Sequence, residues 1–320
     1  MQSPQQQTKS TGFFLVGPTA VGKTAVAHWI AERHGFDILS ADSMLVYRGM
    51  DIGTAKPTPE ERRLVRYHGL DLVLFREPFS VGEYRAAALQ AIRETGAAGR
   101  RLIVTGGTGL YVKCLTDGLM ARPPRNDNIR AQAECLLTER GVEALQEWLR
   151  CRDPARYQSL SDPRNPRRLI RAIEAAESGE TVAGTPWNAP RTGPRIPGLM
   201  LPPDTLYDLI EKRVHRMYAA GLIEEVQHLM AQGLASAPTA SKAIGYAEAM
   251  VYLNGRRTRD EAFAETVLRT RRLAKRQMTW FRHQANVDWL EIDASMPVAA
   301  RARKVLDYWE ARGPTPIAGV

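Results

Sequence analysis

Residues 17–24 read Gly17-Pro18-Thr19-Ala20-Val21-Gly22-Lys23-Thr24, which fits the phosphate-binding pattern G-x-x-x-x-G-K-[ST]. The apolar residues 13–16 before it are typical of a buried strand, and apolar residues recur after it at helical spacing over 26–30. A loop that joins a strand to a helix offers free backbone N–H groups to phosphates. Lys23 adds a positive charge and Thr24 a hydroxyl for Mg²⁺. The sequence therefore predicts a bound diphosphate or triphosphate.

Strand-like runs at 13–16, 36–40, 71–75 and 101–105 alternate with helical stretches such as 84–95, which favours a parallel sheet with helices on both faces. From Arg122 to Arg171 the pattern is helical, with 11 arginines, no lysines and 7 acids. We expect an α/β fold, in which a P-loop-containing parallel sheet core flanked by helices carries a small helical insertion domain. The expected segments are a disordered N-terminus over 1–11, a core over 12–117 and 198–320, and a basic insertion over 118–197.

The later part of the chain predicts further elements of the core. Short strands are expected at 198–201 and 287–292, and helices at 204–217, 222–231, 241–253 and 259–283, with Asp204 as a candidate cap of the first of these helices. In the insertion, helices are expected at 128–148 and 166–177.

Composition limits the partners and the compartment. The formal net charge of +9 over 320 residues favours a polyanionic partner over an acidic protein or a membrane. The three cysteines form no C-x-x-C pair, so a zinc site or a disulfide framework is not expected. The polar start of the chain and the lack of 18 consecutive apolar residues predict a soluble cytoplasmic protein. A monomer is the default expectation.

Asp42 follows the strand predicted at 36–40, at the sheet edge where open α/β sheets bind ligands. Three roles are open to this carboxylate: a general base, a water-mediated contact to Mg²⁺, or a helix cap. Glycines 106, 107 and 109 follow the strand at 101–105 at the same edge. That strand lacks the terminal, metal-holding Asp of many ATP-hydrolysing proteins, so an ordinary ATPase is disfavoured.

Two groups of arginines suggest anion binding, each with a simpler alternative. Arg213 falls into the apolar stripe of its predicted helix, where it needs an anionic partner, unless Val214 takes the inward position and Arg213 extends to solvent. Arg269, Arg272 and Arg276 share one face of the helix predicted at 259–283. Such a face suits an RNA backbone, although the charge alone favours a solvated basic face.

Seven motifs together resemble the tRNA dimethylallyltransferase family, also called tRNA isopentenyltransferase, over residues 12–290. They are residues 17–24, Ala41-Asp42-Ser43, Tyr47-Arg48-Gly49-Met50-Asp51-Ile52-Gly53-Thr54-Ala55-Lys56-Pro57, Gly106-Gly107-Thr108-Gly109-Leu110-Tyr111, Arg168-Leu169-Ile170-Arg171-Ala172-Ile173-Glu174, Ile244-Gly245-Tyr246 and Ala274-Lys275-Arg276-Gln277-Met278-Thr279-Trp280. The stretches 51–57 and 274–280 are the most distinctive. This chain departs from the family pattern at Leu45, where Gln is common, and at Ala247, where Lys or Arg is usual.

The resemblance implies transfer of a dimethylallyl group from dimethylallyl diphosphate to the exocyclic N6 amine of the adenine 3′ of the anticodon, with Mg²⁺. It implies that Asp42 accepts the amine proton, and that Lys23, Thr24 with Mg²⁺ and Arg213 stabilise the departing diphosphate. The diphosphate would bind to Gly17, Pro18, Thr19, Ala20, Val21, Gly22, Lys23, Thr24 and Arg213. The tRNA anticodon stem-loop would contact Asp42, Ser43, Met44, Leu45, Thr108, Arg130, Arg167, Arg168, Leu169, Ile170, Arg171, Lys242, Ile244, Gly245, Tyr246, Arg272, Lys275, Arg276, Gln277 and Thr279.

Two other functions are compatible with parts of the pattern. A P-loop kinase that phosphorylates a small metabolite or nucleotide would bind ATP and use Asp42 to activate a hydroxyl. A non-catalytic RNA-binding protein would keep the nucleotide fold and its basic surfaces without the chemistry. Label transfer from dimethylallyl diphosphate to tRNA separates the transferase from both.

Overall fold

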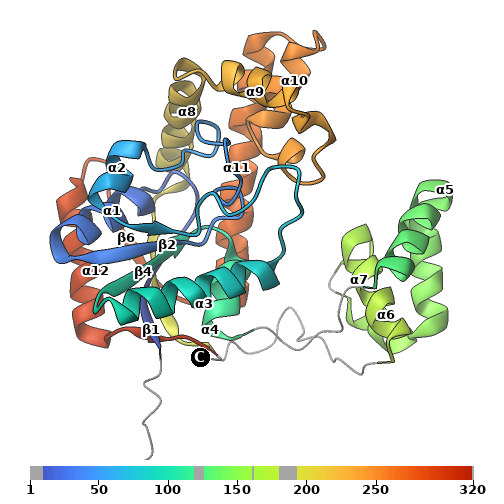
Figure 1. The fold of residues 1–320 in the computed structure, drawn as a ribbon, viewed down its shortest axis with the longest axis horizontal. Helices are drawn as coiled ribbons and strands as arrows, with labels where there is room; N and C mark the ends of the chain where they lie inside the picture. Colours follow the sequence, from blue (N-terminus) through green and yellow to red (C-terminus); the bar gives the residue numbers. More distant parts are fainter. Residues whose placement is uncertain (1–9, 119–125, 161, 180–192, 319–320) are drawn as a thin grey trace, which may run out of the picture. The chain divides into compact units, whose positions relative to one another are not determined.

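The computed structural model describes residues 10–118, 126–160, 162–179 and 193–318 (Figure 1). Its strands are β1 (Thr11–Val16), β2 (Phe36–Ser40), β3 (Tyr67–His68), β4 (Arg101–Gly106), β5 (Arg195–Met200), β6 (Asn286–Glu291) and β7 (Thr315–Pro316). Its α-helices are α1 (Lys23–His34), α2 (Pro59–Leu64), α3 (Val81–Ala97), α4 (Gly109–Thr116), α5 (Asp127–Arg152), α6 (Pro154–Ser159), α7 (Pro166–Glu177), α8 (Pro203–Ala219), α9 (Leu222–Ala231), α10 (Tyr246–Leu253), α11 (Arg259–Gln284) and α12 (Val298–Arg312). Two short 3₁₀ turns are η1 (Leu234–Ser236) and η2 (Ala240–Lys242).

The strands form one sheet in the order β3-β2-β4-β1-β5-β6, and all of these neighbours are parallel. The short β7 pairs antiparallel with the start of β1. Because parallel strands end at the same edge, the loops that follow β1, β2 and β4 meet at the carboxyl edge of the sheet. The parallel sheet flanked by helices confirms the predicted fold class.

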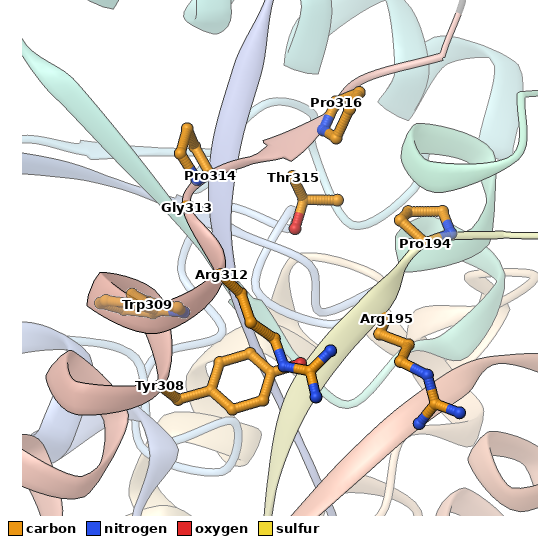
Figure 2. Close-up of a pocket in the computed structure, with 9 residues that line it drawn as sticks. All are labelled: Pro194, Arg195, Tyr308, Trp309, Arg312, Gly313, Pro314, Thr315 and Pro316. Carbon is orange, nitrogen blue, oxygen red and sulfur yellow. The ribbon is translucent and has the colours of Figure 1, made fainter.

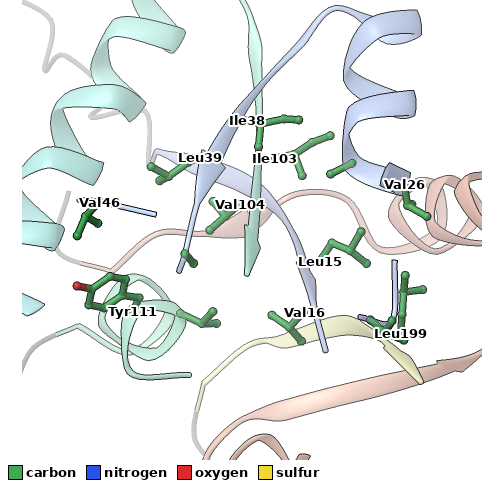
Figure 3. Close-up of a cluster of buried hydrophobic side chains, with 14 of the residues drawn as sticks. Leu15, Val16, Val26, Ile38, Leu39, Val46, Ile103, Val104, Tyr111 and Leu199 are labelled. Atoms are coloured by element: carbon green, nitrogen blue, oxygen red, sulfur yellow. The ribbon is translucent and has the colours of Figure 1, made fainter. Parts of the chain in front are cut away.

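Apolar side chains of the central strands fill the space between the sheet and its helices (Figure 3). The strand β2 is buried along its whole length, as strands covered on both faces are. Helices α1 and α12 pack together beside the strands, and α3 and α4 lie on the other side of them. This packing fixes the strand ends, and with them the loops that carry the polar residues described below.

Helices α8, α9, α10 and α11 pack against one another (Figure 1). On α8, Leu206, Ile210 and Val214 face the core, at helical spacing. Helix α11 spans 26 residues and also contacts α4 and β6. A single long helix therefore runs from the helical layer to the sheet.

The chain divides into two compact units, Met1–Gly118 with Arg191–Val320, and Leu119–Pro190. The predicted boundaries were 117/118 and 197/198. The second difference has a simple cause, because β5 pairs with β6 from Arg195 onward and so brings residues 195–197 into the sheet. In the smaller unit α5, α6 and α7 enclose their own apolar cluster, which includes Leu145, Leu149 and Ile173. Of the N-terminal segment predicted to be disordered, residues 1–9 lie outside the described residues, and Thr11 already belongs to β1.

The chain leaves the larger unit and returns to it at neighbouring points. A Cβ atom added at Gly193 would lie 2.2 Å from Oδ1 of Asp117, the residue that follows α4. Residues 117 and 193 are therefore in contact although 75 residues separate them in the sequence. No helix in the described part of the chain is both long and apolar enough to cross a membrane.

Some predicted elements are wrong. Residues 71–75 form no strand, because Asp71 has a left-handed backbone (φ 54°) and only Val73 bridges to Tyr47; the outer strand is β3 instead. The expected helix over 128–148 is interrupted at Gly141, where φ is 78°. The expected helix over 241–253 begins only at Tyr246. Asp204 lies inside the first turn of α8 and is not its cap, which is Pro202.

Candidate functional site

The first glycine loop, residues 17–22, joins the end of β1 to the start of α1. Ala20 has φ 65°, a conformation that costs energy for any residue other than glycine and that is common at ligand sites. The backbone N–H of Thr19 donates to Oε1 of Gln277 at 2.8 Å, so α11 holds the middle of the loop. The strand, loop and helix expected from residues 13–30 are all present, and the loop lies at the carboxyl edge of the sheet.

Lys23 is buried at the start of α1, and its Nζ donates to the carbonyl of Pro18 at 2.7 Å. Burial lowers the pKa of Lys23 to about 7, with Asp42 opposing the shift and Arg213 adding to it. Removing an ammonium from water disfavours its charge, and a bound anion restores that charge. The three side chains thus act on one another electrostatically, although they come from three separate segments of the chain.

Asp42 is half-buried in the loop after β2, and its Oδ1 accepts the backbone N–H of Met44 at 2.9 Å. No helix begins after it before α2 at Pro59, which Thr58 caps, so the interpretation of Asp42 as a helix cap is wrong. The carboxylate is instead held in a turn beside two cations. This leaves it placed for chemistry at the sheet edge.

Arg213 is half-buried on α8, and its Nη2 donates to the carbonyl of Thr54 at 3.2 Å. Val214 occupies the core position, 1% exposed, so the apolar stripe passes through Val214. Arg213 is nevertheless desolvated: burial lowers its pKa, while Asp42 raises it and Arg216 lowers it further. The two sequence alternatives are therefore both partly right, because Val214 points inward and Arg213 still faces the charged site.

The second glycine loop, residues 106–109, lies between β4 and α4 and contacts both the Asp42 loop and α11. Thr108 Oγ1 accepts the backbone N–H of Ser43 at 3.0 Å, and the Thr108 N–H donates to the Ala41 carbonyl at 3.0 Å. A Cβ at Gly109 would lie 2.0 Å from the ring of Trp280, so only glycine allows α11 to approach this closely. The loops after β1, β2 and β4 therefore form one assembly with α11.

Thr24 follows Lys23 in the first turn of α1 and is exposed. Among the residues that the structure describes, no three His, Cys, Asp or Glu side chains gather as a metal cage. Mg²⁺ commonly binds one or two protein oxygens and completes its shell with water and substrate phosphates. The exposed Thr24 hydroxyl beside a phosphate-binding motif fits a site of that kind.

Helix α11 carries two kinds of cation. Arg269 pairs with Glu248 and Arg271 pairs with Glu211. Arg272, Lys275 and Arg276 are exposed, and the described part of the chain supplies no ion-pair partner for them. Thr279 and Lys242 are also exposed, whereas Gln277 is half-buried against the first glycine loop.

Several side chains predicted to contact tRNA are engaged inside the protein. Tyr246 is 0% exposed, its neighbour Gly245 is also buried, and Ile244 is half-buried. In the smaller unit, Leu169 and Ile170 belong to the apolar cluster, while Arg167 and Arg168 are exposed. Arg130 and Arg171 both bind the fully buried carboxylate of Glu174, at 2.9 Å each.

Sequence patterns did not single out Glu225 or Asp37. Glu225 on α9 accepts hydrogen bonds from residues 51–53, more than 170 positions away, and no local motif marks such a contact. Asp37 is buried at the start of β2, where it binds His68 and Arg100. A charged residue inside a buried strand was the one available signal for Asp37.

A pocket of about 350 Å³ lies at the amino edge of the sheet, where β7 pairs with the start of β1 (Figure 2). It lies beside the amino ends of β1 and β5 and is lined by Pro194, Arg195, Tyr308, Trp309 and residues 312–316. Both arginines at this pocket, Arg195 and Arg312, pair with Asp288. Lys23, Asp42 and Arg213, by contrast, converge at the carboxyl edge of the sheet.

The fold and the site define an α/β protein that brings a carboxylate, a buried lysine and a half-buried arginine to the carboxyl edge of a parallel sheet, beside a phosphate-binding motif. Residues 45–284 match the family model described as IPP transferase. The chain belongs to this family of transferases, and it is an enzyme of the prenyltransferase class.

Curated relatives named tRNA dimethylallyltransferase agree with that assignment. The protein of Thermobifida fusca is 43% identical over 296 residues, covering 89% of this chain and 91% of the relative. That of Corynebacterium jeikeium is 40% identical over 290 residues, covering 89% and 93%. The solved tRNA isopentenylpyrophosphate transferase of Bacillus halodurans is 37% identical, covers 95% of this chain and 98% of its own, and has a TM-score of 0.67. These matches favour the transferase over the kinase and the non-catalytic RNA-binding protein.

Proposed function

We propose that this protein transfers the dimethylallyl group of dimethylallyl diphosphate to the exocyclic N6 of the adenine 3′ of the anticodon, and releases diphosphate. The observation that carries the proposal is the convergence of Lys23, Asp42 and Arg213 beside the first glycine loop, where the Asp42 carboxylate is close enough to raise the pKa of both cations against the effect of burial. Membership of the transferase family and the tRNA named by its curated members supply the chemical class.

The charges suit a leaving group that becomes more anionic as it departs. The C–O bond between the prenyl carbon and the diphosphate breaks, and the electron pair stays on the diphosphate oxygen. Lys23, Arg213 and the backbone N–H groups of residues 20–22 in the first glycine loop are the donors for that charge. Both cations are already desolvated, so their electrostatic effect on a bound anion is larger than it would be in water.

Asp42 is the base in this proposal. The adenine nitrogen forms a new N–C bond with the first prenyl carbon and must lose one proton, which the Asp42 carboxylate accepts. The turn that fixes Asp42 through the Met44 N–H keeps the carboxylate near the cations before the adenine arrives. Mg²⁺, held by the Thr24 hydroxyl and the diphosphate oxygens, would add positive charge at the leaving group.

The target adenine must leave its stack to reach the half-buried Asp42 carboxylate at the sheet edge. Ser43, Met44 and Leu45 are half-buried around Asp42, and Thr108 fixes this loop through the Ser43 N–H. The exposed cations Arg272, Lys275 and Arg276 suit the phosphates of an anticodon stem-loop. Arg167 and Arg168 offer a second set of exposed charges on the smaller unit. Leu45 and Ala247 replace the polar residues common in the family, and we expect them to change RNA affinity and leave the transfer step intact.

A cytoplasmic monomer fits the proposal, since unmodified tRNA is a cytoplasmic substrate and the three cysteines, Cys114, Cys135 and Cys151, are free thiols.

The test uses labelled dimethylallyl diphosphate with unmodified tRNA and Mg²⁺. We expect label in the RNA and one diphosphate released per prenyl group. Asp42→Asn should lower kcat by at least about 100-fold, the usual range for a lost general base, while the Kd for tRNA changes less than about threefold. ATP turnover without RNA labelling, or an Asp42→Asn variant with unchanged kcat, would refute the proposal.

A further inference from the structure

Glu225 binds three successive backbone N–H groups of one loop. Its Oε2 accepts from Asp51 at 3.1 Å and from Ile52 at 2.8 Å, and its Oε1 accepts from Gly53 at 3.4 Å. Hydrogen bonds to a carboxylate are stronger than those between neutral groups. This single side chain, on α9, therefore fixes the conformation of a loop that lies more than 170 positions earlier in the sequence.

Tyr246 holds Glu225 in place. The Tyr246 hydroxyl donates to Oε1 of Glu225 at 2.5 Å, and the ring is fully buried. Burial, and then the neighbouring Glu225 charge, raise the pKa of Tyr246, which keeps the hydroxyl protonated as a donor. A Cβ at Gly53 would lie 2.4 Å from the Tyr246 ring, so the loop rests directly on this side chain.

The far end of the same loop is fixed by a buried lysine. Lys56 Nζ donates to the Tyr47 carbonyl at 2.8 Å, and it pairs with Asp51 at 2.6 Å and Asp71 at 2.7 Å. The Lys56 side chain is 0% exposed, so these partners satisfy a charge that water does not reach. Residues 51–56 are thereby held at both ends.

Between these two anchors lies the carbonyl of Thr54, which accepts the hydrogen bond from Arg213 Nη2. It is the one hydrogen-bond acceptor that the described residues give to the Arg213 guanidinium. The direction of the guanidinium thus depends on where the loop holds this carbonyl.

We infer that Glu225, supported by Tyr246, is a positioning residue that orients Arg213 toward the departing diphosphate through residues 51–54. The inference rests on the proposed function, because it requires Arg213 to act on the leaving group. It also gives the family motif residue Tyr246 a task other than RNA contact. The observed hydrogen-bond partners of this carboxylate are the N–H groups of residues 51–53 and the Tyr246 hydroxyl, so we assign it no direct contact with either substrate.

The test is a double-mutant cycle on the full-length protein, in which kcat and the KM for tRNA are determined by varying tRNA at saturating dimethylallyl diphosphate and Mg²⁺. Glu225→Gln keeps the shape of the side chain and removes its charge. We expect it to lower kcat about tenfold, with the KM for tRNA changed less than about twofold. In an Arg213→Ala background the same substitution should lower kcat less than about twofold, because the group that it positions is gone. Tyr246→Phe, which removes only the hydroxyl, should follow the same pattern with a smaller loss, and it serves if Glu225→Gln does not fold.

Matched controls are Glu224→Gln on the same helix and Tyr252→Phe on the helix of Tyr246, and both should keep the kcat of the unmodified protein. Equal fold-losses from Glu225→Gln in the two backgrounds would overturn the inference, since a merely structural role does not depend on Arg213. An Arg213→Ala variant with unchanged kcat would instead refute the role of Arg213 in the proposed function, and would refute this inference with it.

Discussion

Replacing Glu174 with Gln should loosen the smaller unit of the chain. The Glu174 side chain is 0% exposed, and it binds Arg130 through Nε at 2.9 Å and Nη2 at 3.2 Å and Arg171 through Nη1 at 2.9 Å. Burial alone would raise the pKa of Glu174, but the hydrogen bonds and charges of Arg130 and Arg171 together outweigh it and lower the pKa, so the carboxylate is ionised at pH 7. Gln removes this charge and leaves two arginines facing a neutral amide.

The size of the loss follows from the exposure of the partners. Breaking a fully buried ion pair costs about 3–5 kcal/mol. The side chains of Arg130 and Arg171 are 28% and 30% exposed, so both can turn toward water, and the Gln carbonyl still accepts one bond. We therefore expect a loss of about 2 kcal/mol, within the range for a group left with unmade hydrogen bonds.

Amide hydrogen exchange in α7 measures this loss directly, because Leu169 and Ile173 of that helix lie in the apolar cluster of the unit. A change of about 2 kcal/mol in the opening free energy corresponds to exchange about 30-fold faster. The matched control is Glu147→Gln, an exposed position on α5 that should leave the rates unchanged. Exchange rates close to those of the unmodified protein for Glu174→Gln would show that the buried carboxylate does not hold this unit together.

Two further predictions concern acid stability and RNA binding. Burial alone would raise the pKa of Asp37, but hydrogen bonds from Arg100, His68 and a threonine outweigh it and lower the pKa below its usual 3.8. The stabilisation from the ionised Asp37 carboxylate is therefore complete above about pH 4 and is lost as the pH falls through the lowered pKa. We expect Asp37→Asn to lower the free energy of urea unfolding by about 1–3 kcal/mol at pH 7 and by much less at pH 2. An equal loss at both pH values would contradict this expectation. Replacing Arg272 and Arg276 with Gln should weaken tRNA binding and reduce the slope of log K against log salt by about 0.7–0.9 for each phosphate that is no longer neutralised, and an unchanged slope would mean that this face is only solvated.

Local signals predicted the parts of the fold that local interactions determine. The phosphate-binding motif, β2 and α7 are where the patterns indicate, because a glycine-rich turn, a buried apolar run and an amphipathic helix each leave a mark within a few residues. Residues 71–75 looked like a strand, but Asp71 is bound by Lys56 and Arg62 and turns away from extended geometry. Helix α12, which packs against α1, was not predicted.

The site was predicted in the same uneven way. Lys23, Asp42 and Arg213 come together as the motifs indicate, because each follows a strand end or faces the sheet edge. Motif membership did not distinguish exposed from buried members: Leu169 and Ile170 fill an apolar cluster, and Tyr246 supports Glu225. These roles depend on contacts between distant segments, for which a single sequence carries no local signal.

The contact between Asp117 and Gly193 has a consequence for how this protein can be altered. Because these two residues already touch, a turn of a few residues could join them at little entropic cost. Such a connection would leave the order of the strands in the sheet unchanged. Joining Asp117 to Gly193 by such a turn would therefore remove the smaller unit, Leu119–Pro190, or allow its exchange for a unit of different size, while the loops at the carboxyl edge of the sheet keep the strands that carry them.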